Sequence, residues 1–142
     1  MAFAMKFNMV DVIVSDSLEN CYVNGKRVGF QFDIRLDYYR GQFLSVIEEL
    51  EVTVNGEKID TESIRFRLHD KEFGVCQLET CCNEFWRVTE PATIFVRKGG
   101  GLPEGEHDIE LRLMFRSPYM AIGPNKYMPV DNCGTKKLRV KF

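Results

Sequence analysis

The sequence predicts an all-β protein, built as a two-sheet antiparallel β-sandwich of about seven to eight strands. Three observations support this fold class. Apolar and polar residues alternate with a period of two in most segments, Asn-Gly pairs stand between such segments, and no segment sustains a helical period. Because successive side chains of a strand point to opposite faces, each alternating segment can cover one side of an apolar layer.

Each expected strand places its apolar residues on one face. Phe30, Phe32 and Ile34 share a face in GFQFDIRL, and Ile109, Leu111 and Leu113 do so in DIELRLMFR, the longest case. In chain order, the expected strands are MVDVIV (9–14), GFQFDIRL (29–36), LEVTV (50–54), IRFRL (64–68), TIFVRK (93–98), DIELRLMFR (108–116) and KLRVKF (137–142).

Turn signals separate these strands. VNGK (23–26) and VNGE (54–57) each place Asn-Gly where a two-residue hairpin needs positive φ. GGGLPEGEH (99–107) predicts a flexible reversal before the longest strand. Residues 120–135 are the least patterned, and we expect a loop or an arm there. The whole chain, 1–142, is expected to form a single β-sandwich domain.

Composition excludes several classes of protein. The chain has 142 residues, a formal charge of −2 and a pI near 5.7, which gives no reason to expect nucleic acid or an anionic membrane as a partner. No window approaches the roughly 18 consecutive apolar residues of a membrane helix. Five cysteines and no secretory signal at the N-terminus predict a reduced, cytoplasmic protein.

The sequence contains no recognisable catalytic centre. It has no Gly-x-Ser-x-Gly elbow and no phosphate loop. His69 and His107 stand at strand ends, where an exposed or capping role is expected. Cys76, Cys81 and Cys82 could join His69 as metal ligands, but vicinal cysteines fit zinc spacing poorly. We expect three pairs of carboxylates to lie on solvent-exposed faces: Glu48 with Glu49, Asp60 with Glu62, and Glu104 with Glu106.

Residue types that are common at protein interfaces gather in three connections. The first holds Tyr38, Tyr39, Arg40 and Gly41, with the glycine expected to permit a tight bend. The second connection contains Trp86, which we expect to close an end of the sandwich. The third, residues 119–128, is expected to contact another chain, and it contains Tyr119, Met120, Ile122, Tyr127 and Met128.

Three segments of the sequence are similar to a known family: RLDYYRGQFLSVIEELEVTVNGEKI (35–59), IRFRL (64–68) and EFWRVTEPATIFVRKGGGLPEGEHDIELRLMFRSPYM (84–120). Together they resemble the small β subunit of bacterial C-glycoside deglycosidases. The resemblance covers most of the chain from about Phe30 to Met120 and keeps the family's order. The chain departs from the family at Asp37, where other members often have proline, and at Gln42–Phe43, where they have a Leu-Pro-like pair.

The resemblance implies a β-sandwich that works only with a larger TIM-barrel α subunit, in a higher-order heteromer. The α subunit would carry a divalent, manganese-like metal and the catalytic histidine, and this chain would hold no cofactor. The complex would cleave the carbon–carbon bond between a 3-oxo-glucosyl sugar and an aromatic, flavonoid-like aglycone. No residue of this chain is catalytic by family motif. Tyr38–Gly41 would contact the α subunit or shape the entrance of its active site, and Trp86, Tyr119 and Tyr127 are further candidates.

Two other functions are consistent with the sequence. A stand-alone carbohydrate- or aromatic-binding module would use Tyr38, Tyr39 and Trp86 as a stacking platform. A small metal-dependent enzyme would use His69 and the three cysteines nearest to it.

Overall fold

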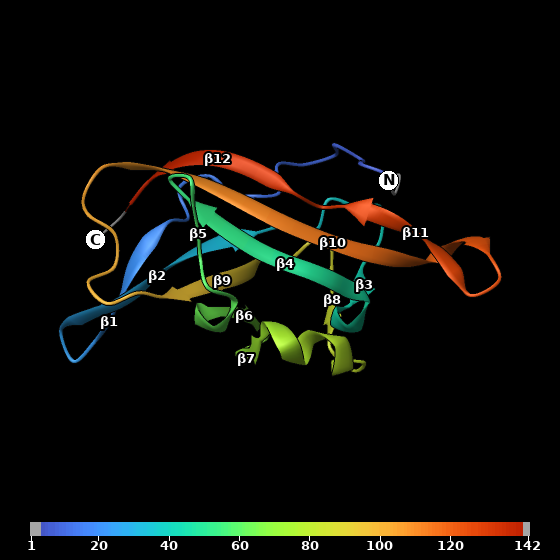
Figure 1. Ribbon diagram of the computed structural model, residues 1–142, viewed down its shortest axis with the longest axis horizontal. Helices are drawn as coiled ribbons and strands as arrows, with labels where there is room; N and C mark the ends of the chain where they lie inside the picture. Colours follow the sequence, from blue (N-terminus) through green and yellow to red (C-terminus); the bar gives the residue numbers. More distant parts are fainter. Residues whose placement is uncertain (1–3, 141–142) are drawn as a thin grey trace.

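Two antiparallel sheets face each other across an apolar layer in the computed structural model of the chain (Figure 1). The structure describes residues 4–140, apart from the side chain of Tyr119. Nearly all of the regular structure is strand, so the predicted all-β sandwich is confirmed. No helix within the described range is long and apolar enough to cross a membrane.

The first sheet has five strands and contains both local and long-range pairs. Two hairpins lie at its edges, and β9, which comes much later in the chain than β2, fits between them. In spatial order the strands are β1 (Glu19–Val23), β2 (Lys26–Ile34), β9 (Ala92–Arg97), β6 (Ile64–Leu68) and β7 (Lys71–Gly74).

The long strand β10 (Glu106–Gly123) organises the second sheet. β4 (Ile47–Val54) pairs along one edge of β10, and β5 (Glu57–Lys58) follows β4. On the other edge, β12 (Gly134–Arg139) pairs with the first part of β10 and β11 (Lys126–Asp131) with its last part.

A two-stranded ribbon belongs to neither sheet. It pairs β3 (Gln42–Phe43) with β8 (Phe85–Trp86), in two residue pairs. Three short 3₁₀ helices complete the described structure: η1 (Leu44–Val46), η2 (Thr61–Ser63) and η3 (Val75–Thr80). The helix η1 follows β3 directly in the chain and packs against η3. The ribbon therefore lies next to these two 3₁₀ helices.

Both predicted Asn-Gly hairpins are confirmed. Asn24 and Gly25 have φ of 52° and 79°, and they join β1 to β2. Asn55 and Gly56 have φ of 51° and 82°, and they join β4 to β5. These left-handed values are the ones that a two-residue turn between twisted strands requires.

The expected inward faces form the core. From residue 29 onward, the inward-facing apolar residues of the expected strands are fully or almost fully buried, including Phe30 and Phe32 on β2 and Ile109 and Leu113 on β10. The last two residues of the expected terminal strand, 141–142, lie outside the described residues.

The N-terminal strand expected in residues 9–14 does not form. This segment makes only one isolated bridge, between Ile13 and Ile34, and its residues Val12 and Ile13 are both buried although they are adjacent. A strand would turn one of the two outward. The segment is instead held by a side chain of another connection, as described below.

Residues 120–135, where we expected a loop or an arm, are mostly strand and form an arm. β10 continues to Gly123, the chain turns at Asn125 with φ of 56°, and β11 returns along β10. In Figure 1 this β10–β11 hairpin extends beyond the rest of the sandwich. Pro118 makes this strand difficult to predict from the sequence, because proline has no N–H to donate to a neighbouring strand. In the structure, Pro118 lies where the pairing register shifts between Arg116 and Ala121.

We predict that Gly29→Ala destabilises the fold. A Cβ at Gly29, in the middle of β2, would lie 2.1 Å from the carbonyl oxygen of Val96 on β9, so the two strands would have to separate. Overpacking of this kind costs about 1–3 kcal/mol. Urea denaturation should therefore show a lower midpoint for this variant.

Gly99→Ala is the matched control, because nothing lies within 4 Å of a Cβ built there. Equal midpoints for the two alanine variants would show that the close approach of β2 to β9 is not required.

Candidate functional site

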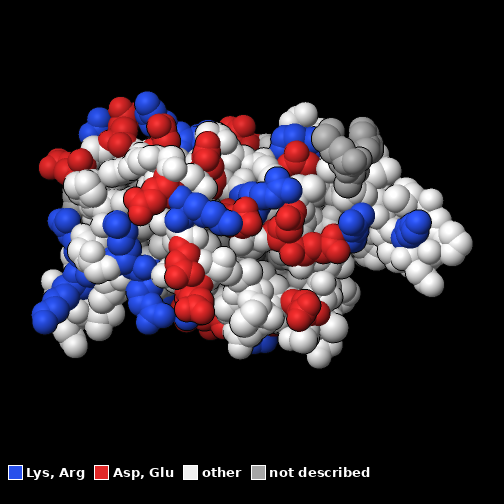
Figure 2. All heavy atoms as spheres, in the orientation of Figure 1, with Lys and Arg blue, Asp and Glu red and all other residues white. Residues whose placement is uncertain are grey.

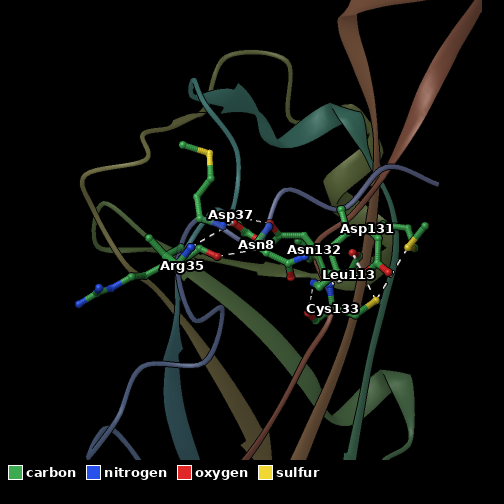
Figure 3. A network of polar contacts seen from close by, with 11 residues as sticks. Asn8, Arg35, Asp37, Leu113, Asp131, Asn132 and Cys133 are labelled. Atoms are coloured by element: carbon green, nitrogen blue, oxygen red, sulfur yellow. Dashed lines mark hydrogen bonds and ion pairs between the residues drawn. The ribbon is translucent and has the colours of Figure 1, made fainter.

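Asp37 fixes the connection that contains Tyr38–Gly41 (Figure 3). Its carboxylate accepts hydrogen bonds from the backbone N–H groups of Asn8 (3.1 Å), Met9 (2.7 Å) and Val10 (3.2 Å). Its own N–H donates to Oδ1 of Asn132 at 2.6 Å. One buried acid therefore holds the N-terminal segment against the end of the first sheet.

Asn132 joins the same network from the short connection between β11 and β12. Its side chain is fully buried, and its Nδ2 donates to the carbonyl oxygen of Arg35 at 3.2 Å. Its backbone N–H donates to the carbonyl oxygen of Leu113 on β10 at 2.9 Å. The network thus joins four segments that are far apart in the sequence.

Neither Asp37 nor Asn132 was identified from the sequence. Asp37 follows Leu36, the last inward-facing residue of its expected strand, so nothing in the alternation marks it as buried. The partners of both residues are long-range, and no local pattern marks them.

Tyr38 lies inside the protein. Its ring packs edge-on against Phe7 (4.8 Å between centroids) and Phe115 (5.3 Å), and its hydroxyl makes a short hydrogen bond with the hydroxyl of Ser117 on β10. Burial, more than any other cause, raises the pKa of Tyr38 to about 12. Tyr38 therefore anchors the connection to the second sheet, and its side chain is not a surface contact.

Tyr39 and Arg40, by contrast, face the solvent, and the side chain of Tyr39 is 48% exposed. Gly41 does not have positive φ, so the expectation that glycine permits a tight bend here is wrong. A Cβ there would lie 2.5 Å from Cε2 of Phe85 and 2.7 Å from the carbonyl oxygen of Trp86. Glycine is required because the connection passes this close to β8.

Trp86 closes the core, as expected. Its side chain is buried, its Nε1–H donates to the carbonyl oxygen of Glu90 at 3.0 Å, and its ring packs edge-on against Phe66. A platform of Tyr38, Tyr39 and Trp86 is therefore not available to a ligand, because two of its three rings are inside the protein. Tyr127, on β11, is 40% exposed, and the side chain of Tyr119 lies outside the described residues.

His69 lies between two carboxylates. Its Nδ1 is 2.6 Å from Oε2 of Glu84, and its Nε2 is 2.6 Å from Oε1 of Glu90. The hydrogen bond to Glu84, chiefly, raises the pKa of His69, while the hydrogen bond from His69 lowers the pKa of Glu84. Lys71 adds a second cation 2.9 Å from Glu84. A protonated imidazole in this position joins the β6–β7 turn to the β8 region, and it is poorly suited to act as a general base.

His107 uses both of its ring nitrogens inside the protein. Nδ1 is 2.9 Å from Nδ2 of Asn55, and Nε2 is 2.8 Å from the carbonyl oxygen of Pro103. Since an amide N–H can only donate, Nδ1 accepts and Nε2–H donates. The buried imidazole caps the start of β10, and Asn55 also accepts from the N–H of Asp108 at 2.9 Å.

The cysteines form no metal site in the described part of the chain, and three of them are thiols with raised pKa values. No group of three or more His, Cys, Asp or Glu residues between residues 4 and 140 is placed to hold a metal ion. Burial raises the pKa values of Cys21 and Cys81, and it raises the pKa of Cys133 to about 11. A reactive thiolate needs a lowered pKa.

The acidic pair on β4 is neutralised by arginines of β10. Glu48 lies 2.6 Å from Arg116, and Glu49 lies 3.0 Å from Arg112. Figure 2 shows the resulting band of alternating charges across this face. The geometry indicates a solvated surface, as the sequence predicted for these acids.

Exposed apolar side chains gather in a few segments. Met9, Tyr39, Phe43, Val88, Ile122 and Tyr127 are among the large apolar residues that are more than a third exposed. They lie on the N-terminal segment, the Tyr38–Gly41 connection, the β3–β8 ribbon and the β10–β11 hairpin. Such residues support binding to another protein more than catalysis by this chain.

Comparison with known proteins gives one family. A sequence profile described as C-glycoside deglycosidase beta subunit matches residues 9–119. The C-glycoside deglycosidase beta subunit of Eubacterium cellulosolvens is 35% identical over 116 residues, which cover 75% of this chain and 79% of that protein. The 3'-dehydrocarminate deglycosidase beta subunit of a Microbacterium species is 32% identical over 130 residues, covering 92% and 93%.

We predict that Asp37→Ala destabilises the protein by about 2–3 kcal/mol, because three backbone N–H groups lose a charged acceptor. The free energy of unfolding from urea denaturation measures the effect. Asp11→Ala serves as control, since its carboxylate is 84% exposed and bonds only the ammonium of Lys136 among the described residues. That variant should lose less than about 1 kcal/mol. Equal losses would contradict a special role for Asp37.

We predict a histidine pKa above the ordinary value of about 6.5 for His69, measured by NMR titration of its Cε1–H resonance. Because the folded-state pKa is raised, the stabilisation from His69 is fully present below the ordinary value and is lost as pH rises through the folded-state pKa. Glu84→Gln should lower the pKa of His69 towards the ordinary value. A pKa at or below the ordinary value in the wild-type chain would disprove the double ion pair.

Proposed function

The chain belongs to the C-glycoside deglycosidase beta subunit family, and from this premise we propose that it is the non-catalytic β subunit of a heteromeric C-glycoside deglycosidase. Its relatives are named as subunits, so the chain takes part in an enzyme complex with a partner subunit. The partner that we propose is a TIM-barrel α subunit, in a higher-order heteromer. With five free cysteines, we place the complex in the reducing cytoplasm.

The state of the ionisable groups is the main support for a non-catalytic role. His69 is engaged by two carboxylates, His107 uses both ring nitrogens internally, and three thiols have raised pKa values. A general base or nucleophile needs a reachable group with a suitable pKa. Among the described residues, these candidates do not offer one, which supports an α subunit that does the chemistry.

The proposed reaction is an elimination. A ketone at C3 of the sugar acidifies the C2 proton, so a base can remove it and leave an enolate. The electron pair then forms a C1–C2 double bond while the C1–aglycone bond breaks. The aglycone carbon takes up a proton, and the overall step cleaves a carbon–carbon bond without oxidation or hydrolysis. One Microbacterium relative is named for a 3'-dehydro substrate, which supports a sugar in the 3-oxo form.

A divalent, manganese-like metal is proposed for the α subunit, where it would stabilise the enolate as a Lewis acid. The described residues of this chain do not fit such an ion, since no group of three suitable side chains is placed to hold it. We therefore assign this chain no step through the metal. Its proposed role is to bind the α subunit and to shape the entrance to the active site, with Tyr39, Arg40 and Tyr127 as exposed contact candidates.

Co-expression with the α subunit tests the proposal. The two chains should elute together in size-exclusion chromatography, and the complex should release the aglycone from a 3-oxo C-glucoside, as measured by liquid chromatography. The β chain alone should release none. The proposal is wrong if the α subunit is fully active alone and never binds this chain.

We predict that Arg40→Ala weakens binding to the α subunit by about tenfold, because arginine beside exposed aromatic rings is a common interface hot spot. Calorimetry on the purified subunits measures the affinity, and circular dichroism should show an unchanged fold. Arg139→Ala is the control: this exposed arginine lies on β12, beside Glu106 at the start of β10. An unfolded Arg40→Ala chain would show that Arg40 is structural instead.

A further inference from the structure

His69 makes two short contacts that a neutral imidazole cannot make together. Nδ1 lies 2.6 Å from Oε2 of Glu84, and Nε2 lies 2.6 Å from Oε1 of Glu90. An ionised carboxylate only accepts hydrogen bonds, whereas a neutral imidazole has one N–H and one nitrogen without a proton. Hydrogen bonds on both nitrogens therefore require the imidazolium. When the ring loses its proton, one nitrogen faces a carboxylate with a lone pair, and that contact is lost.

The two carboxylates belong to the residues that flank β8. Glu84 directly precedes the strand, and its backbone carbonyl oxygen accepts from the N–H of Leu44 at 3.0 Å. Glu90 ends the turn after the strand, and its backbone carbonyl oxygen accepts from Nε1–H of Trp86 at 3.0 Å. His69 thus joins the β6–β7 turn to both ends of β8.

The strand β8 supports the Tyr38–Gly41 connection. A Cβ built on Gly41 would lie 2.7 Å from the carbonyl oxygen of Trp86, so the connection runs directly against the strand. The ladder between β3 and β8 contains two residue pairs, and so short a ladder is marginally stable by itself. Contacts outside the ladder therefore decide how firmly β8 is held.

Glu90 depends on His69 more than Glu84 does. The carboxylate of Glu84 also contacts the ammonium of Lys71 on β7 at 2.9 Å, and its side chain is 12% exposed. The side chain of Glu90 is 24% exposed, and its other contacts among the described residues are with Arg87, in the same turn. The hydrogen bond to Glu84 is also the chief cause that raises the pKa of His69. A neutral imidazole therefore keeps its N–H on Glu84 and releases Glu90.

Other charged or titratable groups lie near the imidazole or its two carboxylates, on each element packed there: Arg67 on β6, Asp70 in the turn, Lys71 and Glu72 on β7, and Cys81 and Arg87 on either side of β8. Arg67 and Glu72 form an ion pair with each other at 2.8 Å. Lys71 contacts Glu84 and Arg87 contacts Glu90. The imidazolium is the cation that the two carboxylates share.

The turn itself does not require an imidazole. His69 and Asp70 occupy its two left-handed positions, with φ of 54° and 61°. Asn24 and Asn55 take the first of these positions in the two Asn-Gly hairpins. Asparagine is among the residues that adopt this conformation most readily. His69→Asn therefore keeps the turn and removes the group that titrates.

We propose that His69 is a pH-operated clamp on β8. The imidazolium holds Glu84 and Glu90 and so fixes the strand between them. After deprotonation, the turn that ends at Glu90 is released, and the indole of Trp86 loses its fixed acceptor. The strand that supports the Tyr38–Gly41 connection is therefore firm at lower pH and looser at higher pH. The clamp lies within this one chain, so it is tested without a partner subunit.

The chain has one tryptophan, which makes the test specific. In NMR spectra of the full-length chain, hydrogen exchange of the Trp86 indole N–H reports how firmly Glu90 is held. At a pH below the pKa of His69, we expect exchange to be about fivefold slower in the wild type than in His69→Asn. At a pH above it, the two rates should converge. Comparing the two chains at the same pH removes the intrinsic rise of exchange with pH.

Glu72→Gln is the matched control. Glu72 lines the same hollow as His69 but pairs with Arg67, so this variant should exchange like the wild type at both pH values. A second measurement needs no variant. In the wild type, the Trp86 indole signal should titrate with the same midpoint as the Cε1–H resonance of His69.

Three results would overturn the clamp. Equal exchange in the wild type and His69→Asn at the lower pH would show that the imidazolium does not hold the strand. An indole signal that does not follow the titration of His69 would separate Trp86 from the imidazole. A Glu72→Gln chain that exchanges as fast as His69→Asn would assign the effect to the loss of any charge in this hollow.

Discussion

The three hydrogen bonds that the Asp37 carboxylate accepts from consecutive backbone amides are the contact on which the Tyr38–Gly41 end of the sandwich depends. The N-terminal segment has no ladder of its own there, so without this acid its N–H groups would need water. The backbone N–H of Asp37 in turn donates to Asn132, which also bonds Arg35, just after β2, and Leu113 on β10. A local cap thus becomes a connection between the two layers of the sandwich.

The position of Asp37 determines how the following residues divide between core and surface. Tyr38 turns inward to Ser117 on β10, and Tyr39 and Arg40 remain outside. Gly41 then allows the chain to pass against β8. The exposed residues are therefore carried on a connection with fixed ends. A rigid connection of this kind loses little conformational entropy when it binds, which is an advantage for a docking surface.

Much of the fold, but less of the site, could be predicted from the sequence. Alternation identified the inward residues of β2, β4, β6 and β10, and Asn-Gly identified two turns, because both signals are local. The division between Tyr38 and Tyr39 depends on Phe115 and Ser117, which are far away in the sequence, and Asp37 depends on Asn132 in the same way. Residues 9–14 alternate only weakly, and their final position is set by Asp37. Long-range hydrogen bonds leave no periodic signal.

The distribution of satisfied and unsatisfied groups is consistent with a chain that works in a complex. Glu48 and Glu49 on β4 each meet an arginine of β10. His69 and His107 have partners on both ring nitrogens. Gln42 differs, because its buried amide has no partner among the described residues. A chain that retains such a group accepts a less stable isolated state, and that cost is consistent with a protein whose functional state is a complex.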